Sequence, residues 1–234
     1  MKFFTNLFKR QESFIEPQSV YDIPGYLDAY ATAARFTESL GFETKAFELG
    51  ETSASVLDLK GDFVDPVFAA ARIKDRTEAA GQCLKWCYYL QPYFERQLGR
   101  RVILTIGQLW NDDVCVFGPR FEDFNRWAQR GLQVDDFTTN GGFKLHAWLT
   151  VETGEIIEPT LLSSLAAFGS PSFRKYAGAI VWGRDPHVLN KHRYVPLALG
   201  NDLVEHIATR SFVPLLASKP DELSLQAYAV IGKQ

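Results

Sequence analysis

The stretch FKLHAWLTVETGEIIE, residues 143–158, decides the fold of this chain because it specifies a β-hairpin and the register of its two strands. Apolar residues occupy the odd positions from Phe143 to Val151. This period of two is typical of a strand that turns one face toward a core. His146 and Trp148 then lie on the opposite face of the strand.

The loop of this hairpin decides which residues of the second strand share a face with His146. A two-residue loop would pair Leu149 with Glu158 and turn the carboxylate onto the apolar face. A three-residue loop at 152–154 pairs Leu149 with Ile157 and suits a glycine in the left-handed conformation. The hydrophobic pattern selects this second register, because a slip of one residue reverses every side chain. We therefore expect His146 and Glu158 on one face, at a diagonal offset of roughly 7 to 8 Å.

Cys83 comes two residues after Gly81 and opens a stretch, 83–98, whose apolar spacing predicts a helix. A thiol at a helix N-terminus lies at the positive end of the helix dipole, which favours the thiolate. A nucleophilic cysteine also needs a base and a group that orients the base. The predicted catalytic residues are therefore Cys83, His146 and Glu158.

The other two cysteines are weaker candidates for the nucleophile. Cys87 lies one turn inside the predicted helix, beyond the free N–H groups of the first turn. Cys115 stands in a Val-Cys-Val-Phe run and is interpreted as packing. A zinc site built from Cys83, Cys87 and His146 is disfavoured, because Cys-x3-Cys spacing is poor and a fourth ligand is not evident. We expect no metal and no cofactor.

Acyl transfer also needs hydrogen-bond donors for the oxyanion, close to the nucleophile. The backbone N–H of Cys83 is the first choice, and the side chains of Gln82 and Gln108 are further candidates. Trp148 either shields the histidine from water or fills a groove, and the sequence pattern does not separate these two interpretations.

Helices are expected in the first half of the chain and antiparallel strands later, which predicts an α+β fold. Besides the helix at 83–98 and the hairpin, the patterns indicate helices at 24–40, 66–79, 121–129 and 161–167, and strands at 56–59, 102–106 and 114–117. The first helix is expected to bury a stripe that consists of Leu27, Tyr30, Ala31 and Ala34. Pro92 should kink or split the helix at 83–98.

Residues 1–20 are predicted to be an N-terminal arm before a single domain, 21–234, with a core at about 60–170 and a C-terminal elaboration at 171–234. Residues 1–12 have one apolar helical face beside Lys9 and Arg10, which permits weak contact with a membrane or a partner. Packing of the arm on its own domain is the favoured interpretation.

Composition and charge exclude several classes of protein. Hydrophobic residues make up 46% of the chain and charged residues 23%, as in soluble globular domains. A net charge of -3 gives no electrostatic reason to expect nucleic-acid binding. Three cysteines without framework spacing argue against a disulfide-stapled secreted domain. We find neither a membrane span nor a signal-peptide core, so we expect a cytoplasmic protein, or one exported without a cleaved signal.

A cysteine at a helix start, a His-x-Trp strand and an acidic-Pro-Thr strand end together resemble the transglutaminase-like branch of the papain-like cysteine superfamily. The residues that carry this resemblance are Gly81, Cys83, His146, Trp148, Gly154, Glu158, Pro159 and Thr160. It covers roughly residues 78–162, and Glu158 stands where that branch usually has aspartate. The resemblance implies a papain-like fold, in which the helix that bears the cysteine packs on an antiparallel sheet that bears the histidine and the acid. It also extends to bacterial proteins of unknown function, which implies a bacterial source.

The expected function is hydrolysis or acyl transfer at an amide of a peptide or protein, through a Cys-His-Glu triad and a thioester intermediate. Two alternatives remain open on the sequence. One is a papain-like binding module without turnover. The other is an interaction protein whose arm, residues 1–12, contacts a membrane or a partner.

Overall fold

The computed structural model describes residues 13–49, 61–137, 143–185, 188–189 and 191–224. The predicted strand at 56–59 and the predicted membrane or partner contact through residues 1–12 lie outside the described residues. None of the helices within the described ranges combines the length and the apolar character that crossing a membrane requires.

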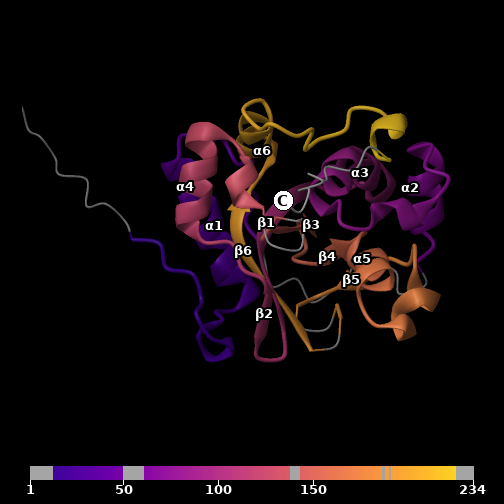
Figure 1. The fold of residues 1–234 in the computed structure, drawn as a ribbon, viewed down its shortest axis with the longest axis horizontal. Helices are drawn as coiled ribbons and strands as arrows, with labels where there is room; N and C mark the ends of the chain where they lie inside the picture. The colour runs from indigo at the N-terminus through magenta and orange to yellow at the C-terminus, as the bar shows by residue number, and fades with distance from the viewer. Residues whose placement is uncertain (1–12, 50–60, 138–142, 186–187, 190, 225–234) are drawn as a thin grey trace, which may run out of the picture.

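The described chain contains helices and strands in mixed order around one sheet (Figure 1). The helices are α1 (Tyr26–Ser39), α2 (Val64–Ala70), α3 (Cys83–Leu98), α4 (Phe121–Arg130), α5 (Leu161–Phe168) and α6 (Asn201–Ala208). The strands are β1 (Val102–Asn111), β2 (Val114–Phe117), β3 (His146–Val151), β4 (Ile156–Glu158), β5 (Val181–Gly183) and β6 (His192–Leu199). In Figure 1 the strands run through the middle of the molecule, with α1 and α4 on one side of the view and α2 and α3 on the other.

Strand β1 organises a six-stranded antiparallel sheet among the described residues. Its residues 102–107 pair with β3, and its residues 109–111 pair with β2. Strand β6 pairs with residues 105–111 of β1. This range overlaps both the range that pairs with β3 and the range that pairs with β2. Because a strand has only two edges, β6 occupies one edge of β1, while β2 and β3 follow one another along the other edge. Strands β4 and β5 then extend the sheet beyond β3.

The predicted α+β class is confirmed, and residues 171–234 contribute β5 and β6 to the same sheet. Strand β6 buries six consecutive residues, from Tyr194 to Leu199, between helices on both faces of the sheet. The chain beyond residue 170 therefore supplies a strand that is central to the packing.

The β3–β4 hairpin has the register that the hydrophobic pattern predicts. Leu149 pairs with Ile157, and the N–H of Val151 donates to the carbonyl of Glu155 across 2.8 Å. Gly154 has a φ of +81°, which places it in the left-handed region. The three-residue loop at 152–154 is confirmed.

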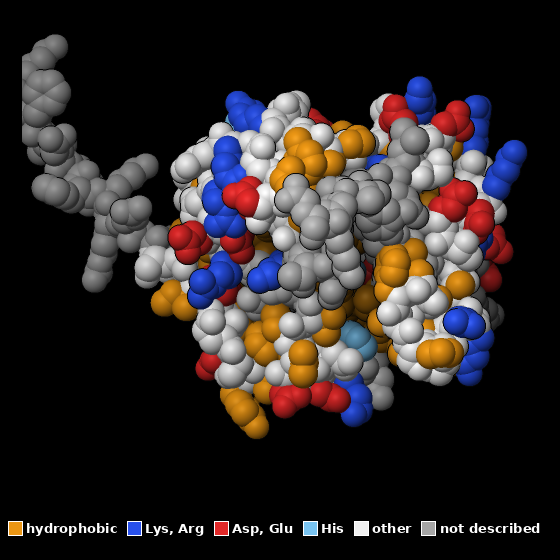
Figure 2. Space-filling view, viewed as in Figure 1, with side chains coloured by type: hydrophobic (Ala, Val, Ile, Leu, Met, Phe, Trp, Pro, Cys, Tyr) orange, Lys and Arg blue, Asp and Glu red, His pale blue; other side chains and the backbone are white. Residues whose placement is uncertain are grey.

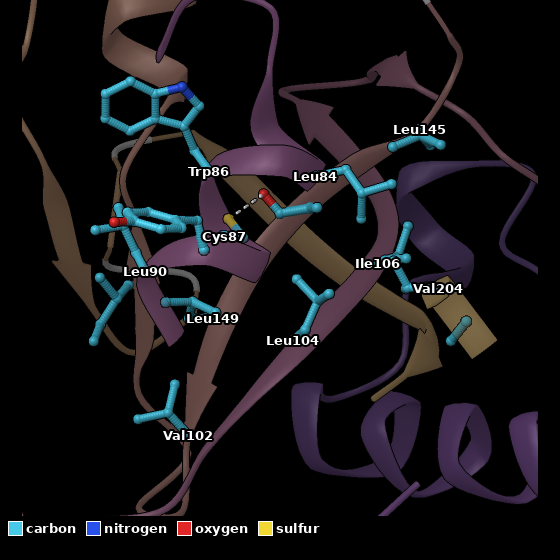
Figure 3. Packing of buried hydrophobic residues seen from close by; sticks show 14 of the residues in the cluster. Leu84, Trp86, Cys87, Leu90, Val102, Leu104, Ile106, Leu145, Leu149 and Val204 are labelled. Atoms are coloured by element: carbon cyan, nitrogen blue, oxygen red, sulfur yellow. Dashed lines mark hydrogen bonds between the residues drawn. The ribbon is translucent and has the colours of Figure 1, made fainter. Parts of the chain in front are cut away.

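Helix α3 begins at Cys83, as predicted, and its buried side packs on β1 and β3. Figure 3 shows Cys87 and Leu90 on the side of α3 toward Leu149, while the Trp86 indole points away from Leu104 and Leu149. The Cys87 thiol lies 3.4 Å from the carbonyl oxygen of Ala147, the contact drawn as a dashed line in Figure 3. This packing fixes the first turn of α3 beside the start of β3.

Pro92 neither splits nor ends α3, which continues unbroken to Leu98. The Pro92 side of the helix is exposed to solvent. Of the kink and the split predicted at Pro92, the split is wrong.

Of the stripe predicted for α1, Tyr30 is buried, but Leu27, Ala31 and Ala34 are not. The buried residues of α1 are Tyr26, Ala29, Tyr30, Ala33, Phe36 and Thr37. The hydroxyl of Thr37 accepts a hydrogen bond from the N–H of Leu199 across 3.1 Å. A hydroxyl with a partner inside the fold is buried at little cost, which rotates the buried face of the helix away from Leu27 and Ala31.

The helix predicted at 66–79 is two separate elements. Helix α2 ends at Ala70, and Arg72 has a φ of +58°, which an α-helix does not permit. A short 3₁₀ helix, η2 (Arg76–Ala79), follows and leads into the turn before α3.

Gly107 lies on β1 beside an irregularity in the pairing of this strand with β6. A Cβ atom there would come within 1.9 Å of the carbonyl oxygen of Val195. We expect Gly107→Ala to lower the free energy of unfolding by about 1–3 kcal/mol, as overpacking does. Gly25→Ala is the control, because a Cβ at Gly25 meets only a carboxylate oxygen of Asp28 at 3.5 Å. Urea unfolding measures both variants, and equal losses would contradict this assignment.

Candidate active site

Cys83 is the first residue of α3 and lies beside the start of β3. Its sulfur is 4.0 Å from the carbonyl oxygen of Leu145, the residue before His146, and the Cys83 side chain is one of the groups that raise the pKa of His146. The thiol is half-buried, whereas Cys87, one turn further along the helix, is completely buried. Of these two thiols, Cys83 is the one that an external reagent reaches.

His146 and Glu158 form a buried pair across the β3–β4 hairpin. Nε2 of His146 is hydrogen-bonded to Oε2 of Glu158. The histidine is 2% exposed and the glutamate 0%, so water does not compete for this bond. Because Glu158 engages Nε2, the other ring nitrogen is the one left for the thiol of Cys83. Three side chains from α3, β3 and β4 thus form a continuous chain of contacts.

The second carboxylate oxygen of Glu158 is held by the start of α5. Oε1 accepts hydrogen bonds from the N–H of Thr160 at 2.9 Å, the hydroxyl of Thr160 at 3.0 Å and the N–H of Leu161 at 3.1 Å. Backbone N–H groups at a helix N-terminus favour a negative charge. These donors fix the carboxylate in the orientation that the imidazole requires.

The charge of the pair follows from the competing effects on His146. Burial lowers the pKa of His146, but the charge of Glu158 and the hydrogen bonds with Cys83 and Glu158 raise that pKa to about 10. The imidazole is therefore protonated near neutral pH and forms an ion pair with the carboxylate. In contrast, burial raises the pKa of Cys87 well above its ordinary value, and that thiol remains protonated.

Aromatic side chains surround the imidazole on the sides away from Cys83. The ring of Phe117 stacks on His146 with 5.0 Å between centroids, and Trp148 and Tyr194 lie at 6.1 and 6.2 Å. Nε1 of Trp148 donates to the hydroxyl of Tyr26 across 2.8 Å, which fixes the indole. Trp148 is completely buried, so it excludes water from the imidazole and also fills the space beneath it. The position of Trp148 is compatible with both alternatives, shielding of the histidine and filling of a groove.

The two glutamines that were candidates for the oxyanion site are engaged elsewhere. Nε2 of Gln82 donates to the carbonyls of Glu78 at 3.0 Å and Leu223 at 2.9 Å, which uses both hydrogens of the amide. Nε2 of Gln108 donates to the carbonyl of Pro119 at 3.2 Å. Gln82 ties neighbouring turns to α3 and has no hydrogen left for a substrate oxygen.

Several residues that build this site were not identified from the sequence. Thr160 and Leu161 anchor Glu158, and Phe117 and Tyr26 support the imidazole and the indole. The one available signal was Thr160, which follows the acidic residue and precedes a predicted helix. Phe117 and Tyr26 reach the site from distant parts of the chain, and local periodicity does not reveal such contacts.

Within the described ranges, no group of three or more histidine, cysteine, aspartate or glutamate side chains is arranged to hold a metal ion. Compared with known proteins, the chain matches no family model, no curated protein and no solved structure.

The raised pKa of His146 predicts how stability changes with pH. Protonation of His146 stabilises the fold fully below its unfolded pKa of about 6.5, and this contribution is lost as pH rises toward about 10. We therefore expect the free energy of unfolding to fall more steeply between pH 6.5 and 10 in the wild type than in His146→Gln, which does not titrate. Urea unfolding across this range provides the measurement. Parallel curves for the two proteins would contradict the raised pKa.

The ion pair between His146 and Glu158 also predicts how the titration of the imidazole depends on Glu158. Glu158→Gln removes the negative charge, so the midpoint of the His146 titration should fall from near pH 10. Long-range nitrogen-detected NMR of the ring nitrogens follows that midpoint. Glu152→Gln is the control, because that exposed carboxylate pairs with Arg100 and Arg101 instead.

Proposed function

We propose that this protein is a cysteine-dependent hydrolase or acyltransferase that acts on amides through Cys83, His146 and Glu158. One observation carries the proposal: an accessible thiol at a helix N-terminus lies beside the start of the strand that bears a buried imidazole, and this imidazole is held by a buried carboxylate. This is the order of nucleophile, base and orienting group that thiol catalysis uses.

The same arrangement supports a papain-like fold and, with it, the transglutaminase-like resemblance of the sequence. Helix α3 begins at the proposed nucleophile and packs on an antiparallel sheet, and two strands of that sheet bear the base and the acid. Glu158 takes the place of the usual aspartate. Its longer side chain still reaches the imidazole, because the hairpin register and the start of α5 set its position.

The chemistry follows from the protonation state of the pair. The Cys83 thiolate attacks the amide carbonyl carbon, and the imidazolium of His146 gives its proton to the departing amine as the C–N bond breaks. A thioester on Cys83 remains. The imidazole then removes a proton from water or from a second amine, which attacks the thioester and releases an acid or a new amide.

The negative oxygen of each tetrahedral intermediate needs donors that the first turn of α3 supplies. The first intrahelical hydrogen bond of this region runs from Trp86 to Gln82, so the N–H of Cys83 has no acceptor within the helix. This N–H belongs to the nucleophile itself, and the helix dipole adds to its effect. We assign the oxyanion contact to the backbone of Cys83.

Thiol reactivity tests the proposed nucleophile. Iodoacetamide at pH 7 should alkylate Cys83 faster than Cys115, a half-buried thiol whose pKa burial raises to about 11. Because His146 is the proposed base for the thiol, His146→Gln should slow alkylation of Cys83 and leave Cys115 unchanged. Peptide mass spectrometry measures both rates in one sample. If Cys83 reacts no faster than Cys115, the site is not an activated thiol.

Trapping of the intermediate tests the proposed turnover. Para-nitrophenyl acetate should transfer one acetyl group to Cys83 and release nitrophenolate, and hydroxylamine should remove the acetyl group. Cys83→Ala should abolish the adduct, and His146→Gln should slow its formation by about 10²–10⁴-fold, the usual contribution of a general base. Cys115→Ala is the matched control. Rapid alkylation of Cys83 without any acetyl adduct would identify a binding module that lacks turnover.

A further inference from the structure

We infer that the outer edge of strand β2 binds the substrate as an extended polypeptide strand, and that this edge leads the bound chain to Cys83. The inference deepens the proposed function, on which it rests, by naming the substrate class as an unfolded or flexible peptide segment. It depends on three features of β2: an edge without a strand partner, an apolar exposed surface and direct continuity with the imidazole.

Strand β2 has an unpaired edge among the described residues. It pairs with β1 through Leu109, Trp110 and Asn111, and no other described strand pairs with it. The described turn and loop hydrogen bonds likewise include none from the backbone of residues 114–117 to another segment. A strand directs alternate N–H and C=O groups to each side, so β2 presents one set of these groups away from β1.

The edge of β2 carries neither of two residue types that commonly protect such strands. Val114 is 59% exposed and Val116 is 47% exposed, and the strand contains neither a charge nor a proline. Its protection consists of its short length and of a bulge at Val116, which has no partner on β1 because Cys115 and Phe117 pair with consecutive residues of that strand. An apolar edge without charge or proline is a surface to which an added peptide strand binds.

The end of β2 meets the proposed catalytic residues. Strands β2 and β3 follow one another along the same edge of β1, in the same direction, because both are antiparallel to β1. Phe117 ends β2 and stacks on His146, which begins β3. The sulfur of Cys83 lies 4.0 Å from the carbonyl oxygen of Leu145, the residue before β3. A peptide paired with β2 therefore reaches the thiol as it passes Phe117.

The shape of the surface agrees with this path. Figure 2 shows the described surface indented between the region over β2 and the region over α5 and the 3₁₀ helix η4 (Pro171–Tyr176). Helix α5 supplies the N–H of Leu161 that holds Glu158, so this indentation lies between the proposed docking edge and the element that anchors the triad. An extended chain fits such an indentation.

The side chains of β2 indicate what the bound peptide contains. Side chains of neighbouring strands on one face contact each other, and the exposed face of β2 offers Val114 and Val116. Apolar or β-branched residues at alternate positions of the peptide match this face. In the turn before β2, Asp112 is already paired with Lys191 across 2.9 Å, so Asp113, which is exposed, is the acidic group that a basic residue at that end of the peptide would meet.

Chloromethyl ketones that alkylate Cys83 test the inference. Three probes are compared on the whole protein: acetylglycine chloromethyl ketone, a valine-rich tetrapeptide chloromethyl ketone, and the same tetrapeptide with N-methylated backbone amides. The unmethylated tetrapeptide should inactivate the thiol about tenfold faster than its N-methylated form, the effect expected for the loss of about two backbone hydrogen bonds. Equal rates for the methylated and unmethylated tetrapeptides would overturn the proposal, because strand pairing requires the N–H groups.

A pair of exposed valines provides the matched variants. Val116→Asp should remove the advantage of the tetrapeptide, whereas Val134→Asp, at a valine 56% exposed outside the sheet, should retain it. In each variant the tetrapeptide rate is divided by the rate with acetylglycine chloromethyl ketone, so that a general change in the reactivity of Cys83 cancels. If Val116→Asp and Val134→Asp respond equally, β2 is not the docking edge.

Hydrogen exchange locates the bound peptide without any substitution. In the tetrapeptide conjugate, the amides of 114–117 should gain protection, while those of β5, at the opposite edge of the sheet, should not. Protection at β5 alone would place the peptide on the wrong edge and overturn the inference. The proposed function fails separately, when acetylglycine chloromethyl ketone labels Cys83 no faster than Cys115.

Discussion

The register of the β3–β4 hairpin is the constraint on which the site depends. A three-residue loop aligns Leu149 with Ile157, and this alignment brings Glu158 to the imidazole of His146. A slip of one residue would turn the carboxylate to the face that packs against α3, where this charge would be buried without the imidazole as its partner. That combination is costly, because an unpaired buried charge destabilises a fold by several kcal/mol. The apolar side of the hairpin and the ion pair on its other side therefore select the same register.

The packing of α3 supplies the second half of the site by a different physical route. Cys87 and Leu90 are completely buried against the sheet, and they fix where the helix begins. Cys83 lies one turn before Cys87, so the position of the accessible thiol is a consequence of core packing. The hydrophobic effect thus sets the distance between the thiol and the imidazole. Hydrogen bonds at the start of α5 set the orientation of the carboxylate.

Local sequence patterns predicted the parts of the fold that have one apolar face, which include the hairpin register and the start of α3. Strand β6 was not recognised, because both of its faces are buried and it contains Pro196 at an irregular position of the ladder. The buried face of α1 was misplaced because the hydroxyl of Thr37 has a partner inside the fold. The triad residues were named from the sequence, but their surroundings depend on long-range contacts. Gln82, expected near a substrate oxygen, instead holds the carbonyl of Leu223.

The uneven burial of the triad determines where chemistry takes place. His146 and Glu158 are closed off from solvent by Phe117, Trp148 and the sheet, while Cys83 remains half-buried. A proton on the imidazole therefore exchanges through the thiol side, where a substrate carbonyl would lie. Burial alone would deprotonate the imidazole, and the carboxylate reverses that effect. The ion pair thus keeps a proton available for a leaving amine in a region that bulk water does not enter, and the chain that carries this amine must approach along the surface beside Cys83.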